Sequence, residues 1–501
     1  MRKFLSCFRL VLWCGVGVSV GHAGEKGEVT LREVHKGTLE VDTRLLDSGG
    51  GLSAERRAFY LSARELLTGS AAARTDDAGV VDAAVRAGVS LMAGPMLGEV
   101  SESGISVWFR PVRAEDLTLR VTAVEGPWKK EIAVRAERAG AVVRTRVCGL
   151  QPDSGYEYQL VDGAGGVLGD GSFRTVPAAG SGETYRIAFG SCFHKIGVHN
   201  PDLMGRIAER GARAMLLLGD LAVDDREAEI NLHSADYLLR DVSGPWRKFA
   251  AQVPVYASWD DHDYLNNDKS GLQSGQITEP ERAAMRDMWR EHWINPERAG
   301  DAGGIYFNTV IGDVEVIMLD TRSCRDWGKQ GSRGSYLGEE QMDWLLRTLR
   351  ASTAKFIILT SGTMWSDAMS GAKDSWGTWD IPAREEIYDL IEANRIGGVL
   401  LLSGDRHGAR GFRIERPSGF KLVEFEAASL GGVPGPKAYA PDRTNQLFGY
   451  AGGLKAFGEF TFDMGKADPE VTFRLIDGEG KVLQEHRYRR SELTPGDGKN
   501  G

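Results

Sequence analysis

The chain has 501 residues, of which 42% are hydrophobic and 26% charged, and its formal net charge is −9. This length exceeds what one ordinary hydrophobic core accommodates, so we expect a globular protein of two or more domains. The negative charge argues against a protein that holds nucleic acid through bulk positive charge. A phosphate group would bind only where metal ions or a few Arg and Lys side chains supply positive charge locally. The composition gives no information on the oligomeric state.

Residues 1–23 have the pattern of an export signal. Arg2 and Lys3 provide a basic start, residues 10–20 are largely apolar, and Gly21-His22-Ala23 offers small residues to a signal peptidase. The apolar run is shorter than the roughly 20 residues of a bilayer span, and no later stretch reaches that length. We therefore predict a periplasmic or secreted protein, cleaved near Ala23 and without a membrane span. A buried helix is the alternative for this segment.

Three cysteines remain after such a cleavage: Cys148, Cys192 and Cys324. An odd number allows at most one disulfide, which excludes a disulfide-stapled scaffold. An unpaired cysteine in an exported protein is a candidate metal ligand or reactive thiol.

Two segments precede the largest part of the chain. Residues 24–87 form a predicted polar and helical lead-in, with helices at Ala54–Leu67 and Asp76–Ala87 and no expected chemistry. In residues 88–178, runs such as Ile105–Arg110 alternate between apolar and polar, as half-buried strands do. Short strands at this spacing, separated by Gly, Pro and Asp turns, predict a β-sandwich. A linker of small residues closes it.

Residues 183–490 show the alternation of strands and helices that is typical of an α/β domain. Expected strands include Ala214–Leu218 and Phe356–Thr360, and Arg226–Leu239 is an expected helix. Further strands near the end of this segment predict two sheets flanked by helices. Residues 491–501 are predicted to be a flexible tail.

The most unusual stretch is Asp260-Asp261-His262-Asp263, which places three carboxylates and an imidazole in four residues. It follows Val253–Ala257, an apolar run with the pattern of a buried strand. Adjacent carboxylates repel one another, so gathering them is costly unless a cation neutralises them. A solvated acidic turn is the alternative, but the embedded histidine and the buried strand favour a metal or acid–base site.

Three further apolar strands end in residues that can bind metals. Arg186–Phe189 leads to Cys192, Ala214–Leu218 leads to Asp220, and residues 399–402 lead to Asp405 and His407. Ligands gather at the carboxyl ends of strands in open α/β sheets. Any one motif is compatible with a plain turn, but four coincident strand ends are not. We therefore expect one crevice that contains Cys192, Asp220, Asp261, His262, Asp405 and His407.

This donor set mixes carboxylate oxygen, imidazole nitrogen and thiolate sulfur. It suits a transition metal, with a harder ion such as Ca²⁺ beside it. Two ions about 3.5–4 Å apart that share one carboxylate can hold a hydroxide and a phosphoryl oxygen together. Asp220 is the predicted bridging carboxylate.

Five motifs, in order, resemble those of the PhoD-like alkaline phosphatases, a family of the calcineurin-like metallophosphoesterases. They are Gly190-Ser191-Cys192, Leu218-Gly219-Asp220, Trp259-Asp260-Asp261-His262-Asp263, Leu319-Asp320-Thr321-Arg322-Ser323 and Ser403-Gly404-Asp405-Arg406-His407. The resemblance runs from residue 88 to residue 430. It includes a fibronectin type III-like module, whose late-strand corner is similar to Leu150–Tyr158. The implied fold is a two-sheet metallophosphoesterase sandwich flanked by helices, preceded by a fibronectin type III-like β-sandwich.

The resemblance also implies a function. The family hydrolyses phosphate mono- or diesters outside the cytoplasm, often with Fe³⁺ and Ca²⁺, so it implies two or more metal ions and a small phosphate-ester substrate. His262 is implied to lie beside the leaving group, and Asn267 lies near an Asn of the family motif. The implied metal contacts are Cys192, Asp220, Asp261, Asn267, Asp405 and His407.

The chain departs from the family pattern at two positions. The family usually has a Tyr that binds the ferric ion three residues after the aspartate of Gly-Asp, whereas this chain has Val223. Asp224 is an alternative ligand, and the identity of the metals stays open. The wider class often supplies a His from the strand before the last motif, where this chain has Ser361.

In the predicted mechanism, a metal-bound hydroxide attacks phosphorus in line. His262 protonates the leaving oxygen or holds the phosphoryl group, and Asp260 or Asp263 fixes its tautomer. Arg322 and Arg406 are candidates to clamp non-bridging oxygens, because a guanidinium matches phosphate geometry. Other histidines are expected to be structural or solvated, namely His194, His199 and His233.

Three functions stay open at this stage. The first is an exported phosphatase acting on monoesters, and the second is the same site acting on diesters such as phospholipid head groups or nucleotides. The third is a non-catalytic binding protein whose metal site is impaired, which Val223 and Ser361 motivate. Within the enzymatic hypotheses, a Cys192 nucleophile activated by His194 is the alternative to a metal-activated water.

Overall fold

The computed structural model describes residues 29–272, 277–297, 303–369 and 374–496. The predicted signal peptide and the end of the predicted tail lie outside these residues. Across the described ranges, no helix combines the length and the apolar character needed to cross a bilayer.

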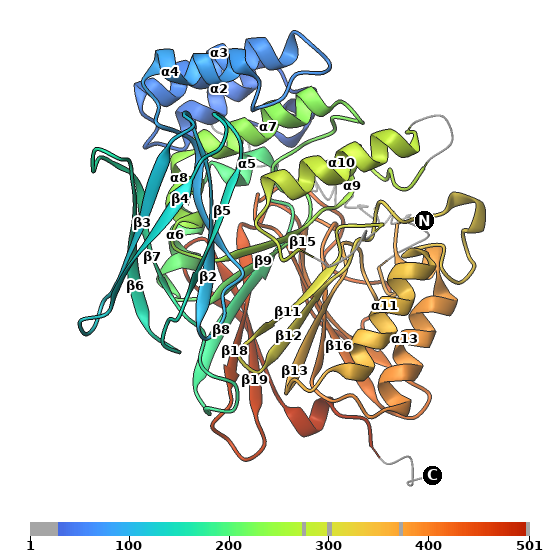
Figure 1. The fold of residues 1–501 in the computed structure, drawn as a ribbon. Helices are drawn as coiled ribbons and strands as arrows, with labels where there is room; N and C mark the ends of the chain where they lie inside the picture. Colours follow the sequence, from blue (N-terminus) through green and yellow to red (C-terminus); the bar gives the residue numbers. More distant parts are fainter. Residues whose placement is uncertain (1–28, 273–276, 298–302, 370–373, 497–501) are drawn as a thin grey trace, which may run out of the picture.

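Four helices open the described chain and share an apolar cluster with α7 (Ile230–Val242), on which α3 (Ala54–Thr68) lies (Figure 1). Two of them were expected, α3 and α4 (Ala78–Ala87). The other two, α1 (Leu31–Lys36) and α2 (Leu39–Ser48), lie in a stretch that the sequence pattern left unassigned. Each begins at a threonine. Thr30 forms a capping box with Glu33 before α1, and Thr38 accepts a hydrogen bond from the backbone of α2.

The next segment is the expected β-sandwich, built from two antiparallel sheets. The first sheet has the order β1 (Leu91–Gly98), β2 (Gly104–Pro111) and β5 (Val143–Cys148). The second has the order β4 (Lys129–Arg135), β3 (Asp116–Ala123), β6 (Gly155–Val161) and β7 (Val167–Arg174). At the corner before β6, the backbone N–H of Gln151 donates to the Tyr156 hydroxyl at 2.8 Å. Such a tyrosine corner is a feature of immunoglobulin-like and fibronectin-like sandwiches.

The largest part of the chain contains two mixed sheets that pack face to face (Figure 1). Strands β8, β9 and β10 run parallel in the first sheet, and β12, β13, β14 and β16 run parallel in the second. The first sheet has the order β10 (Val255–Ser258), β9 (Ala214–Leu218), β8 (Thr184–Gly190), β18 (Ala456–Asp463), β19 (Glu470–Asp477) and β20 (Val482–Arg489). The second has the order β11 (Phe307–Ile311), β12 (Val314–Met318), β13 (Phe356–Thr360), β14 (Val399–Ser403), β16 (Lys421–Ala428), β15 (Gly408–Glu415) and β17 (Gln446–Tyr450).

Helices cover the outer face of each sheet. The first sheet is covered by α6 (Pro201–Glu209), α8 (Gly244–Ala250) and α10 (Glu279–His292), which share an apolar cluster with β9. The second is covered by α11 (Gly338–Ala351) and α13 (Ile381–Ala393), which share a cluster with β13. The shorter helices are α5 (His194–Val198), α9 (Asp261–Tyr264), α12 (Trp376–Trp379) and the 3₁₀ turns η1 (Trp327–Lys329) and η2 (Arg490–Leu493).

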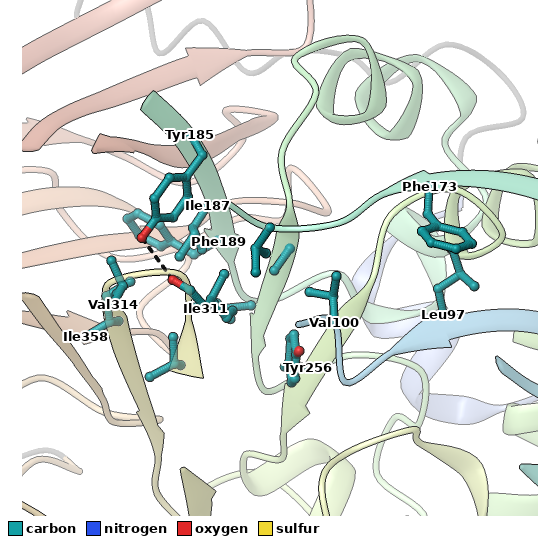
Figure 2. Packing of buried hydrophobic residues seen from close by; sticks show 14 of the residues in the cluster. Leu97, Val100, Phe173, Tyr185, Ile187, Phe189, Tyr256, Ile311, Val314 and Ile358 are labelled. Carbon is teal, nitrogen blue, oxygen red and sulfur yellow. Dashed lines mark hydrogen bonds between the residues drawn. The ribbon is translucent and has the colours of Figure 1, made fainter. Parts of the chain in front are cut away.

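Strands buried on both faces explain the continuous apolar runs in the sequence. In β9, Leu216 and Leu218 point into the core between the sheets, while Met215 and Leu217 point to the outer helices. Figure 2 shows part of the inner core, where the Tyr185 hydroxyl donates to the Ile311 carbonyl at 2.9 Å and ties β8 to β11. The two-sheet α/β sandwich with flanking helices is therefore the architecture that the sequence predicts.

Two boundaries differ from the expectation. The helix expected from residue 226 begins at Ile230, because the residues before it form a loop at the site described below. The tail expected from residue 491 begins inside η2, where Leu493 is buried and its carbonyl accepts a hydrogen bond from Gly398.

The inner core gives a first testable prediction. Phe425 is fully buried between the sheets, where its ring stacks on Phe473 with centroids 4.1 Å apart. Phe425→Ala is expected to lower the free energy of unfolding by about 3–5 kcal/mol, because the cavity adds to the lost transfer energy. Denaturant unfolding measures this value. Val310→Ala, at a side chain that is 54% exposed, is the control and should stay within about 0.5 kcal/mol of the parent chain; equal losses would contradict the packing.

Candidate metal centre

The site is built where strands of the two sheets end. β8, β9, β10 and β14 are followed by Cys192, Asp220, Asp261 and Asp405, respectively. The sheets are tied together at this edge, because the hydroxyl of Ser258, the last residue of β10, donates to the Leu319 carbonyl after β12 at 2.7 Å.

Two glycines permit the close approach of these strand ends. Gly219 has a φ of +95°, and a Cβ there would lie 2.4 Å from the Cβ of Asp260. A Cβ on Gly404 would lie 2.6 Å from the Ser191 hydroxyl and 3.0 Å from the Leu218 carbonyl. Only glycine fits at these positions without displacing the backbone that carries the acidic residues.

Among the described residues, side chains with metal-binding chemistry converge in five overlapping groups, within each of which one donor atom per residue lies within 4.8 Å of the others. Two of these groups contain His35, one with Asp225 and His262 and the other with His194 and Asp224. Asp220 belongs to the other three, which supports its prediction as a shared carboxylate. These three groups are Cys192, His194, Asp220 and His407; Asp220, Asp261 and His262; and Asp220, Asp260, Asp261 and Asp405. The six residues predicted to share a crevice therefore do come together.

The backbone of this region is strained. Six of its non-glycine residues adopt a positive φ, a conformation that costs a residue with a side chain roughly 1–3 kcal/mol. They are Cys192, His194, Asp220, Asp225, Asp405 and His407. Strain of this kind persists only where many surrounding contacts hold the backbone in place, and it is typical of functional sites.

Two histidines show that the donor set fits a cation. His407 Nδ1 donates to the Pro434 carbonyl at 2.7 Å, so its Nε2 carries a lone pair. His194 Nδ1 lies 2.6 Å from the carboxylate of Asp224 and donates to it, which leaves Nε2 as a second lone pair. The two Nε2 atoms are only 3.3 Å apart. Two lone pairs that face each other repel unless a cation or a proton lies between them, so the geometry matches a metal site.

The carboxylates lead to the same conclusion. Among the described residues, one oxygen of Asp220 and one of Asp260 are buried without a hydrogen-bond partner. Burial raises the pKa of the carboxyl groups of Asp220 and Asp405 well above their ordinary value, and neighbouring carboxylates add to the effect. Burial also raises the pKa of the Cys192 thiol. Buried groups of one charge sign reach their ionised forms only with a compensating cation.

His262 is oriented by a different residue from the one expected. Its Nδ1 lies 2.6 Å from the carboxylate of Asp225. Asp260 instead accepts from Arg322, and Asp263 accepts from the backbone N–H groups of Leu221 and Asp260, at 2.8 and 3.1 Å. The prediction that Asp260 or Asp263 fixes the tautomer of His262 is therefore corrected.

The charge of His262 is set by the carboxylates around it. Burial alone would lower the pKa of His262, but the carboxylates of Asp261 and Asp220 raise it well above its ordinary value. His407 shows the opposite balance, because burial and the nearby ring of His194 lower its pKa to about 3.

The Arg322 guanidinium is not free to bind a phosphate group, because carboxylates already contact it. The guanidinium is fully buried and contacts the carboxylates of Asp260 and Asp374, and it lies 3.5 Å from that of Asp261. Its charge therefore offsets the acidic cluster. Arg406 is half-buried, and its Nε has no hydrogen-bond partner in the part of the chain that the structure describes.

Asn267 lies away from the cluster. Its side chain is exposed, and its amide donates to Asp268 at 2.9 Å. The backbone N–H of Asp268, the next residue, donates to Asp261 at 2.6 Å. The structure therefore connects this loop to the candidate ligand Asp261 through a main-chain group and not through the Asn267 amide.

Val223 and its surroundings explain the departure from the family pattern. The Val223 side chain is fully buried in the apolar cluster on the outer face of the first sheet. Tyr237 lies in the same cluster, and the Tyr264 hydroxyl donates to the Gly271 carbonyl. Asp224, considered above as an alternative ligand, instead holds His194 Nδ1.

The sequence interpretation missed His194 at this site. It was expected to be structural, yet it is fully buried and faces His407. A signal was available, because Cys192 and His194 are separated by one residue after a strand, as are Asp405 and His407. His35 of α1 was also missed, and its ring stacks on that of His262 with centroids 4.8 Å apart. Nothing in the local pattern around His35 indicates chemistry.

Known proteins resemble this chain over a range that contains Asp261, His262, Asp405 and His407. Residues 230–474 match the family described as PhoD-like phosphatase. The predicted resemblance to the PhoD-like phosphatases is confirmed. Alkaline phosphatase D of Bacillus subtilis (strain 168) is 25% identical over 315 residues, and the match covers 53% of this chain and 53% of that protein. The chain thus spans about half the length of this curated PhoD-like relative.

Solved structures share the fold. The chain resembles a structure of PhoD with a TM-score of 0.59 and 18% identity, over 79% of this chain and 92% of that one. It resembles a purple acid phosphatase from yellow lupin seeds with the same TM-score and 13% identity, over 80% and 75% of the two chains. These similarities confirm the predicted two-sheet α/β architecture of the chain.

Proposed function

We propose that this protein hydrolyses phosphate esters at the cluster of strand ends around Asp220. The observation that carries the proposal is the pair of Nε2 atoms of His194 and His407, which face each other 3.3 Å apart while each Nδ1 is held by an oxygen acceptor. This arrangement beside buried carboxylates favours bound cations, and a cation cluster of this composition suits a phosphoryl group. The match to the PhoD-like phosphatase family supports the same reaction class.

We propose two or more metal ions as cofactors. A softer position has the donors Cys192, His194 and His407, and a harder position has the carboxylates of Asp261 and Asp405, with Asp220 shared between them. Donor softness suits Fe³⁺ or another transition metal at the first position and Ca²⁺ at the second. Bound there, the ions would supply Lewis acidity that activates water and neutralises phosphoryl oxygens.

The chain's own residues would orient the substrate and move protons. The oxygen of an activated water forms the new bond to phosphorus, and the bond from phosphorus to the ester oxygen breaks. Asp225 holds His262 through Nδ1, so that His262 Nε2 can give its proton to the departing ester oxygen. Arg406, beside Asp405 in the chain, is proposed to contact a non-bridging oxygen of the substrate.

The sequence supports two further proposals. Residues 1–23 would direct export, with cleavage near Ala23 and a periplasmic or secreted product. The chain would divide into the helical lead-in of residues 24–87, the sandwich of residues 88–178, and a catalytic domain of residues 183–490.

The purified protein tests the reaction class. After reconstitution with Fe³⁺ and Ca²⁺, hydrolysis of p-nitrophenyl phosphate is compared with hydrolysis of its bis ester. Preference for the monoester identifies a phosphatase, and preference for the bis ester identifies a diesterase with the same site. Elemental analysis accompanies both assays, because a protein that retains no metal and cleaves neither ester would be a binding protein, contrary to the proposal.

Removal of the metals should affect both activity and stability. Dialysis against a chelator is expected to abolish ester hydrolysis and to lower the melting temperature, because four carboxylate oxygens within 4.8 Å of one another would repel without a cation. Calorimetry and activity assays before and after adding the metals back measure the two effects. A chelated protein that keeps both its activity and its melting temperature would contradict a metal site at the cluster.

A further inference from the structure

The N-terminal helix α1 is fixed against the candidate site by two arginines. Arg226 donates to the carbonyls of Val34 and His35, at 3.0 and 2.9 Å, and Arg64 of α3 donates to the Gly37 carbonyl at 2.6 Å. These carbonyls lie in the last turn of α1 and at its C-cap Gly37, where a helix leaves acceptors without an intrahelical partner; the Val34 carbonyl also accepts from the Gly37 backbone N–H at 3.0 Å. The position of His35 is therefore set by the fold and not by a free chain end.

The His35 ring lies between two consecutive carboxylates. Its Nδ1 is 3.2 Å from Asp225, and its Nε2 is 3.8 Å from Asp224. The ring is also stacked on that of His262, with an angle of 26° between the planes. The side chain is 24% exposed, while those of Asp224 and Asp225 are 0% and 13% exposed.

Each of these carboxylates holds one imidazole of the site. Asp224 accepts from His194, which faces His407, and Asp225 accepts from His262; both contacts are 2.6 Å. A carboxylate that bonds the far nitrogen of an imidazole fixes the tautomer and the direction of the ring. Two adjacent, poorly solvated carboxylates repel each other, and a polar ring between them offsets this repulsion. Asp224 also accepts from the Lys195 backbone N–H at 3.0 Å, and among the described residues Nε2 of His35 has no hydrogen-bond partner, so the closer contact of His35 is that of Nδ1 with Asp225.

We propose that His35 is a positioning residue of the active site, which holds Asp224 and Asp225 in the orientation that directs His194 and His262. This inference rests on the proposed function for its effect on rate. It extends the active site to a helix that lies outside residues 230–474, the part of the chain that matches the family. The helical lead-in, for which the sequence indicated no chemistry, would then be part of the catalytic structure.

Substitutions at His35 separate positioning from packing. His35→Phe keeps an aromatic ring against His262 but removes both nitrogens, and His35→Asn restores a donor close to the position of Nδ1. We expect His35→Phe to lower kcat by about 10–100-fold with KM nearly unchanged, as for other groups that orient site histidines. His35→Asn should recover most of the loss. His486→Phe, in the edge strand β20, is the matched control and should retain the kcat of the parent.

A crystal structure of the full-length His35→Phe protein provides a readout that does not depend on activity. The expected result is that the carboxylate of Asp225 or Asp224 turns away from its imidazole. Unchanged carboxylates together with an unchanged kcat would overturn the proposal, and so would a loss of kcat that parallels a lower melting temperature without rescue by His35→Asn. If the parent protein hydrolyses no ester, the proposed function fails, while the carboxylate positions in the crystal still decide the role of His35.

Discussion

Asp220→Asn is expected to abolish ester hydrolysis, with a fall in kcat of about 10³-fold or more. The substitution keeps the size of the side chain but removes the negative charge that three of the five donor groups share. Loss of one preorganised electrostatic group at a transition state costs about 10²–10³-fold, and a shared ligand acts at more than one position. Elemental analysis of the same preparation should show less bound metal than in the parent protein.

Asp82→Asn is the matched control for this variant. Asp82 lies in α4, exposed and far along the chain from the strand ends, so the same change of charge should leave kcat and metal content unchanged. Circular dichroism of both variants tests whether the fold is retained. An Asp220→Asn protein that is folded, binds metals like the parent and hydrolyses esters at a similar rate would refute the site.

Much of the fold follows from local sequence patterns. Strands β9 and β13 were predicted at their observed bounds, because a strand covered on both faces by the opposite sheet and by helices reads as an uninterrupted apolar run. Helix α1 was missed because it has only six residues, whereas α2 was missed although Val41 and Leu45 have the spacing of a buried helix face. Their start signals were present in the sequence, namely the capping box of Thr30 and Glu33 and the N-cap Thr38.

Some residues of the site could likewise be predicted from the local sequence, and others could not. Cys192, Asp220, Asp261 and Asp405 could be predicted, because each follows a buried strand and parallel strands end at one edge of a sheet. The partner of His262 could not be predicted from proximity in the chain. Asp263, one residue away, is occupied by backbone N–H groups in the capping box of α9.

The true partners come from distant segments. Asp225 follows β9 by several residues, and His35 approaches from a helix about 190 positions earlier; only the packed structure brings them to His262. The same holds for Arg322, whose family-like motif suggested a phosphate clamp. Burial among three carboxylates decides its contacts, and burial is a property of the whole fold.

His262→Asn is expected to show whether this residue protonates the leaving group. The Asn amide can keep a contact to Asp225 near the position of Nδ1 but supplies no transferable proton at Nε2. We expect kcat for phenyl phosphate to fall by about 10²–10⁴-fold, the usual contribution of general acid catalysis. The loss for p-nitrophenyl phosphate should be smaller, because nitrophenolate leaves readily without protonation.

The dependence on the leaving group distinguishes proton donation from other roles of His262. If the residue only held the phosphoryl group, both substrates would lose the same factor, since both present the same phosphoryl oxygens. His486→Asn, remote from the cluster in β20, provides the baseline for replacing a histidine by asparagine. An equal loss of kcat for the two substrates in His262→Asn would therefore mean that His262 binds phosphate and that Asp225 orients this imidazole. The proton of the leaving oxygen would then have to come from another group.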